Sequence, residues 1–396
     1  MKTVKIPLPR LVLLFATAIA FTTSACPGEL RLIDSPYRSL NRIDYRLIRT
    51  ELDSIFGDIE EISQKSKIAK ERYEWATTLQ KKYSSLVKIL PLKSDTGPKE
   101  LLKLLQSGGE DVVPAVERYL SPQQIKDLPN KPINVLFAYR IFSQKSEGKK
   151  DVLLWANEHS NEIETADLLE DLTQFLVSQM IEKKESGKPI SYLHNVIHKI
   201  FEKINLIIVP SLSPDLSTSE NKIQDKNWFG VWLQPFNYDT PDPITLALAP
   251  EAKFFKELTQ SLKNLKMGVD IHCPYETTTY TMQADKFKDK TPYIAGELDY
   301  AMKCLSYYNN AREFVGYAPH DLMTSSLNNE ICKDGNQFTP STEISWGSSD
   351  SSSYLSRQKN IPTLFLEMGG SKPRNLQLRL YLPWFIRLLE LAAYGI

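Results

Sequence analysis

Residues 152–162 read Val-Leu-Leu-Trp-Ala-Asn-Glu-His-Ser-Asn-Glu, an apolar run of five residues that passes directly into a polar segment. Similar apolar runs occur at residues 133–139, 206–209, 269–271 and 363–366, and longer segments with helical spacing separate them. Short apolar runs of this kind are typical of strands that are buried on both faces, as in parallel sheets covered by helices. The sequence therefore predicts an α/β fold with a mixed, mostly parallel central sheet and helices on both of its faces.

Polar residues that can bind a metal follow three of these predicted strands. His159 and Glu162 follow residues 152–156, His272 follows residues 269–271, and Glu367 follows residues 363–366. The carboxyl ends of parallel strands form the usual ligand-binding edge of such a sheet. Two histidines and one carboxylate would bind a tetrahedral zinc ion and leave its fourth position open for water.

Each of these residues also has an ordinary structural explanation. The pair His159 and Glu162 could be a surface pair, His272 a core histidine, and Glu367 a carboxylate at a helix N-terminus. Their joint occurrence after three predicted strands is what favours a metal site with Glu367 as a catalytic base.

The arrangement resembles the zinc carboxypeptidase family and the related acyl-amino-acid deacylases. The resemblance extends from about Tyr73 to residue 396, and it rests on the His-x-x-Glu motif at 159–162, on a distant histidine and on a late glutamate. Residues 209–215, Val-Pro-Ser-Leu-Ser-Pro-Asp, resemble a family strand that leads into Asn-Pro-Asp, and residues 270–272 resemble the family's Asp-Leu-His.

This resemblance implies a zinc hydrolase that cleaves an amide bond in a peptide or an acylated amino acid. It assigns Zn²⁺ to His159, Glu162 and His272 and the role of general base to Glu367, with zinc polarising the carbonyl and acidifying its bound water. The alternative is a catalytically inactive peptide- or glycan-binding module built on a hydrolase fold.

The sequence departs from the family at the residues that bind the terminal carboxylate of a substrate. Gln234-Pro235 stands where an Asn-Arg pair is expected, and no arginine occurs in the sequence between Arg140 and Arg312. Lys226 is a substitute cation, although it lacks the bidentate geometry of arginine. We therefore take Lys226 and Gln234 as candidate substrate-binding residues.

The N-terminus has the layout of a secretory signal. Lys2, Lys5 and Arg10 precede an apolar run at residues 11–21, which is followed by the small residues 22–25. The run is shorter than the roughly 20 residues that a membrane-spanning helix needs. We expect a secreted or periplasmic protein.

We divide the sequence into three segments: a signal peptide at 1–25, a helical N-terminal segment at 26–70 and a carboxypeptidase-like catalytic domain at 71–396. The sequence before Cys26 also resembles a lipoprotein cleavage box, so a lipid tether to the membrane through Cys26 stays open beside free secretion. Within residues 91–130, several turn signals predict short helices between loops.

The remaining features exclude other classes or favour structural roles. The formal net charge of zero gives no sign of a nucleic-acid partner, and we expect a monomer. The sequence lacks the Gly-x-Ser-x-Gly motif of serine hydrolases. The serine-rich residues 348–353 are typical of a flexible linker, and His194 with His198 is typical of a packed amphipathic helix.

Overall fold

The computed structural model describes residues 47–48, 51, 54, 66–109, 111–130, 133–143, 148–159, 162–181, 191–214, 243–275, 279–283, 351–355, 359–369 and 374–394. Internal contacts divide the chain into two units, residues 1–42 and 43–396, and every described residue belongs to the second unit. None of the helices in the described ranges combines the length and the apolar composition that a membrane span requires.

A seven-stranded mixed sheet forms the centre of this unit, with the strand order β1-β2-β4-β3-β5-β7-β6. The four central strands β4, β3, β5 and β7 are parallel, whereas β1, β2 and β6 add antiparallel pairs at the two edges. The predicted fold class is therefore confirmed. The strands are β1 (Val87–Asp95), β2 (Val135–Ile141), β3 (Lys150–Ala156), β4 (Ile204–Val209), β5 (Leu265–Tyr275), β6 (Thr279–Gln283) and β7 (Thr363–Gly369).

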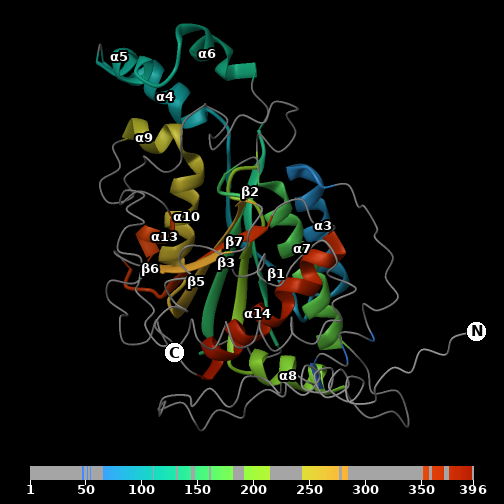
Figure 1. Ribbon diagram of the computed structural model, residues 1–396. Coiled ribbons are helices and arrows are strands. Elements are labelled where there is room, and N and C mark those ends of the chain that lie inside the picture. The colour runs from blue at the N-terminus through green and yellow to red at the C-terminus, as the bar shows by residue number, and fades with distance from the viewer. Residues whose placement is uncertain are drawn as a thin grey trace, which may run out of the picture. The chain divides into compact units, whose positions relative to one another are not determined.

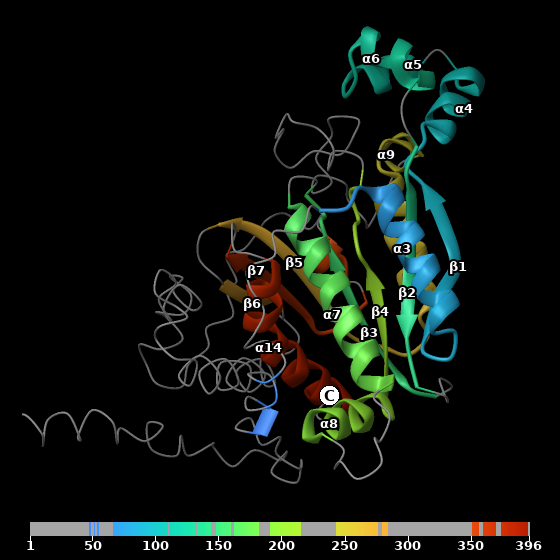
Figure 2. The same ribbon diagram turned by 90° about the vertical axis from the view of Figure 1, so that its right-hand side faces the viewer.

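Helices cover both faces of the sheet, as Figures 1 and 2 show. Successive residues of β3 point to opposite faces, so Val152 and Leu154 join one apolar cluster while Leu153 and Trp155 join the other. The first cluster contains residues of α3 (Ala69–Lys82), α7 (Ile163–Ile181), α8 (Tyr192–Phe201) and α14 (Arg374–Tyr394). The second contains residues of α4 (Lys99–Ser107), α5 (Val112–Glu117), α9 (Pro243–Leu248) and α10 (Pro250–Ser261).

Five of the seven strands match the apolar runs of the sequence, while β1 and β6 were not predicted. The β1 strand contains Pro91, and its pairing with β2 shifts between Ile89 and Lys93. Proline removes a backbone donor, so strands tolerate it at sheet edges and bulges, and β1 is an edge strand. The short helices predicted within 91–130 are confirmed by α4, α5 and α6 (Pro122–Asp127).

A buried group of charges joins α3 to α7. The guanidinium of Arg72 donates to Asp167 at 2.8 Å and to Glu170 at 2.7 Å, and Lys67 also donates to Glu170 at 2.6 Å. Arg72 is 2% exposed, so its two bonds operate away from solvent. Because a buried charge is costly without a partner, this group fixes where α3 lies against the sheet.

We predict that Arg72→Ala strongly destabilises the fold, because it removes the main cation beside two buried carboxylates. The free energy of unfolding, measured by urea denaturation, is expected to fall by about 3 to 5 kcal/mol. The matched control is Lys70→Ala on the same helix, whose 3.8 Å pair with Glu74 is exposed. Its expected cost is below about 1 kcal/mol. Equal losses in the two variants would contradict a stabilising role for the buried group.

Candidate metal centre

The polar segment after β3 begins with a turn made by Asn157. This residue has a φ of 54°, in the left-handed region that asparagine tolerates better than most residues. Its amide nitrogen donates to the carbonyl of His159 at 2.6 Å, and its side-chain oxygen accepts a hydrogen bond from Ser211 at 2.6 Å. The turn therefore holds the backbone of His159 at the carboxyl end of β3.

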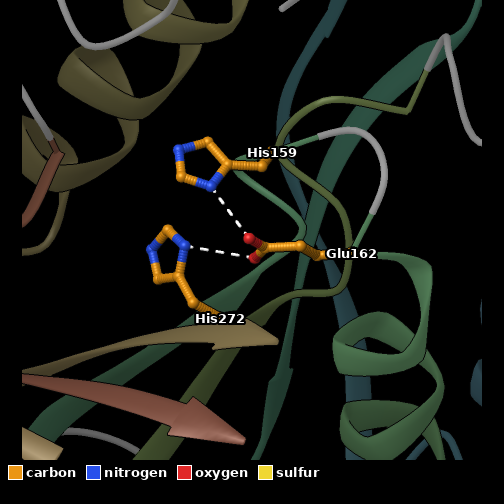
Figure 3. Close-up of side chains that lie close together, drawn as sticks. All are labelled: His159, Glu162 and His272. Atoms are coloured by element: carbon orange, nitrogen blue, oxygen red, sulfur yellow. Dashed lines mark hydrogen bonds and ion pairs between the residues drawn. The ribbon is translucent and has the colours of Figure 1, made fainter. Parts of the chain in front are cut away.

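Glu162 lies immediately before α7 and carries the central carboxylate of the site. The backbone N–H of Glu162 donates to the carbonyl of His159 at 3.0 Å, which closes the short loop between them. Its two side-chain oxygens face two different histidines: one lies 2.9 Å from Nδ1 of His159 and the other 3.1 Å from Nδ1 of His272 (Figure 3). The backbone N–H of Cys273 also donates to this carboxylate at 3.1 Å.

His272 comes from the neighbouring strand β5, which places it beside the loop that follows β3. Strands β3 and β5 are parallel neighbours, with Ala156 opposite Ile271. His272 is almost fully buried, whereas the His159 side chain keeps 12% of its exposure. The two rings meet edge to face with their centroids 4.8 Å apart. The site is thus closed on the His272 side and retains solvent access at His159.

The charges at this site are strongly coupled. Burial opposes ionisation of Glu162, but attraction to His272 and the bonds to both histidines outweigh it and lower the pKa of Glu162 to about 2. Burial likewise disfavours the charged form of His272, yet Asp270 and Glu162 raise its pKa well above the usual value. The site therefore favours a positive charge between its carboxyl groups.

The three predicted ligands fit a metal ion. His159, Glu162 and His272 each offer one ligand atom, and these atoms lie within 4.8 Å of one another. Both imidazoles direct Nδ1 toward the same carboxylate, and neutral imidazole nitrogen with carboxylate oxygen is a zinc donor set. The sequence prediction thus identified three residues that the fold brings together.

The other predicted site residues are placed only in part. Glu367 lies within β7, and in the register between β5 and β7 its backbone stands opposite His272. Its side chain lies outside the described part of the structure, as do Lys226 and Gln234 entirely. His272 and Glu367 lie inside their strands, because β5 and β7 extend a few residues beyond the apolar runs.

Sequence reasoning gave no role at the site to three polar residues beside this cluster: Glu158, Asp270 and Ser351. Asp270 lies 2.9 Å from Nε2 of His272, and Ser351 bonds to both Glu158 and Asp270. The expectation of a flexible linker is wrong for Ser351 and Ser352, which are fully buried in the short helix α13 (Ser351–Ser353). The signal that could have found Glu158 and Asp270 is their position in the sequence, within two residues of the predicted ligands His159 and His272.

No protein-family model matches the sequence, and no curated protein matches it. The solved structures that this chain resembles include metallocarboxypeptidases. A putative carboxypeptidase A from Shewanella denitrificans is 14% identical, with 82% of this chain and 68% of that chain covered and a TM-score of 0.48. A metallo-carboxypeptidase from Burkholderia cenocepacia is 17% identical, with 81% of this chain and 69% of that chain covered and a TM-score of 0.49.

The carboxypeptidase A from Helicoverpa armigera is 11% identical, with 88% of this chain and 80% of that chain covered and a TM-score of 0.48. These proteins are of the class that the sequence motifs resemble. Likeness at this level does not assign an activity, so the function rests on the residues of the site.

We predict that Asn157→Ala costs about 2 to 4 kcal/mol of unfolding free energy, because it adds left-handed strain and removes two hydrogen bonds, one buried and one partly buried. The control is Asn360→Ala, since Asn360 has a φ of 55° but is exposed. We expect about 1 kcal/mol for the control. Thermal and urea unfolding of both variants check this, and equal costs would mean that the side-chain bonds of Asn157 contribute nothing.

Proposed function

We propose that this protein is a zinc-dependent hydrolase that cleaves an amide bond in a peptide or an acylated amino acid. The observation that carries the proposal is the convergence of His159, Glu162 and His272 at the carboxyl ends of two parallel strands. Two imidazoles and one carboxylate are the ligands of a catalytic zinc site, which keeps a position open for water or substrate.

Each residue of the site has a distinct role in this proposal. His159, Glu162 and His272 hold the ion, and we assign substrate entry to the side of His159 because its side chain is 12% exposed. When bound, zinc supplies a Lewis acid that polarises a carbonyl and lowers the pKa of water toward neutrality. Glu367 takes a proton from the attacking water and passes it to the departing amine. Its register position opposite His272 supports this assignment.

The substrate assignment is coarser than the chemistry. Lys226 and Gln234 are proposed to contact the substrate, with Lys226 as a point charge rather than a bidentate carboxylate clamp.

The signal-like residues 1–25 support a secreted or periplasmic protein, with Cys26 as the residue that a lipid tether would use. We propose that the protein acts as a monomer.

The competing proposal is an inactive module that binds peptides or glycans. The absence of arginine between Arg140 and Arg312 in the sequence favours it, because it removes the family's usual carboxylate and transition-state contacts. The assembled ligand set argues against it, since binding alone does not need two histidines and a carboxylate at one point. Turnover separates the two proposals.

We predict one zinc per chain in the purified protein, measured by elemental analysis, and its loss in His159→Ala and in His272→Ala. His198→Ala, on helix α8, is the control that retains the metal. Amide hydrolysis is expected to stop with a chelator and to return with zinc. Glu367→Gln is expected to keep the zinc but to lose about 10²- to 10⁴-fold in rate.

Two outcomes would contradict this prediction in different ways. Zinc content unchanged in both ligand variants would exclude the site itself. Zinc bound normally but without turnover of peptides or acylated amino acids would favour the inactive binding module.

We also predict that the enzyme tolerates substrates with an amidated C-terminus, because Gln234-Pro235 replaces the Asn-Arg pair. A charged hydrogen bond contributes about 1.5 to 3 kcal/mol, so an arginine clamp would discriminate against the amide by roughly ten-fold or more. Hydrolysis of matched free and amidated peptides is therefore expected to differ by less than about ten-fold. A strong preference for the free acid that survives Lys226→Ala would overturn this prediction.

A further inference from the structure

A second polar network lies against His272, on the side away from Glu162. The carboxyl group of Asp270 lies 2.9 Å from Nε2 of His272, and its other oxygen is 3.2 Å from the hydroxyl of Ser351. The same hydroxyl donates to Glu158 through a short hydrogen bond, and the backbone N–H of Ser351 lies 3.4 Å from that carboxyl group. Nε1–H of Trp155 donates to the Ser351 oxygen at 2.9 Å.

Every member of this network is buried. Trp155, Asp270 and Ser351 have no exposed surface, and Glu158 is 2% exposed. The members come from β3 and the turn after it, from β5 and from α13, so the bond from Ser351 to Glu158 joins residues 193 positions apart. A hydroxyl at this junction ties three separate segments to one point behind the metal cluster.

Glu158, Asp270 and His272 also lie close enough together to be considered as a second cation site. The directions of their contacts favour a different role. Nε2 of His272 is engaged by Asp270, and the Ser351 hydroxyl lies within hydrogen-bond distance of both carboxyl groups. These contacts tie both carboxyl groups to protein atoms behind His272, which fits support for the ligands of a single metal better than a second cation site.

The chemistry of metal-bound histidine explains why a carboxylate beside His272 would matter for metal binding. A histidine that binds a metal through one ring nitrogen usually donates its other N–H to a carboxylate, which fixes the tautomer and the ring orientation. Asp270, 2.9 Å from Nε2 of His272, is the carboxylate placed to take this part, and Nδ1 of His272 lies on the side of Glu162. Asp270 can do so only if it is itself held, and Ser351 bonds to its other oxygen.

We propose that Ser351 is a positioning residue of the metal centre, which acts through Asp270 on His272. Trp155 fixes the Ser351 hydroxyl, and the hydroxyl in turn fixes Asp270 and Glu158. This inference rests on the proposed metal site, and it extends that site to a serine far along the sequence.

The test is Ser351→Ala in the full-length protein, with zinc affinity measured by competition against a chromophoric chelator. Loss of an outer-shell partner is expected to weaken zinc binding by about 10- to 100-fold. The visible spectrum of the Co²⁺-loaded protein is expected to change, because the His272 ring is no longer held in one orientation. Asp270→Asn keeps the side-chain volume, removes the carboxylate that holds His272 and is expected to weaken binding at least as much.

The matched control is Thr173→Val, which removes a buried hydroxyl that bonds to Tyr139 on the first apolar face of the sheet. Thermal unfolding of the metal-free proteins is expected to show similar losses for Ser351→Ala and Thr173→Val, whereas only the former weakens zinc binding and alters the Co²⁺ spectrum. Thr173→Val thereby separates positioning of the metal ligands from general loss of packing.

Three results would overturn the inference. Unchanged zinc affinity and Co²⁺ spectrum in Ser351→Ala, with binding abolished in His159→Ala, would reject the positioning role and leave the metal site intact. Two zinc ions in the wild type, one of them lost in Ser351→Ala, would make the network a second cation site. Absence of zinc binding in the wild type would reject the metal site and with it this inference.

Discussion

The carboxylate of Glu162 is the interaction on which the site depends, because both histidines turn Nδ1 toward it. His159 reaches it across a three-residue interval, and His272 reaches it from a different strand. The carboxylate can occupy this position because α7 begins at Ile163 directly after it and because the N–H of Cys273 donates to it. A helix start, a turn and the end of a strand therefore converge on one side chain that is 1% exposed.

The parallel sheet explains why such distant residues meet. Neighbouring parallel strands end at the same edge, so residues that follow β3 and those near the end of β5 are close in space regardless of their separation in sequence. The pairing register of β5 with β3 fixes which residue of β5 faces Glu162. A shift of this register by one residue would turn the His272 side chain to the opposite face of the sheet. Burial of alternate residues of β3 in two apolar clusters makes that slip costly.

The sequence predicted the parts that follow from local periodicity and from strand ends. The apolar runs located five strands, and the polar residues after them located His159, Glu162 and His272. The β1 strand was not predicted because Pro91 and the turns that follow it are typical of loops. A strand tolerates this proline here because β1 lies at the edge of the sheet.

The buried position of Ser351 was not predicted for a different reason. Its environment is created by Trp155, Glu158 and Asp270, which lie 81 to 196 positions away, and no local pattern distinguishes a buried serine from the exposed serines of a linker. A serine-rich segment predicts flexibility only if water satisfies its hydroxyl groups. Here Glu158 accepts the proton of the Ser351 hydroxyl and the indole N–H of Trp155 donates to its oxygen, so it packs inside the fold.

The balance of charge at the site is a further argument for a bound cation. Glu158, Glu162 and Asp270 are each no more than 2% exposed, and burial of carboxyl groups is costly unless cations or donors compensate them. Ser351 and Cys273 supply neutral donors, and the raised pKa of His272 favours a positive charge on its imidazole. This is the imidazole that would have to be neutral to bind the metal. A divalent ion among His159, Glu162 and His272 would replace this charge and add a second one. Binding of such an ion would therefore release the proton of His272.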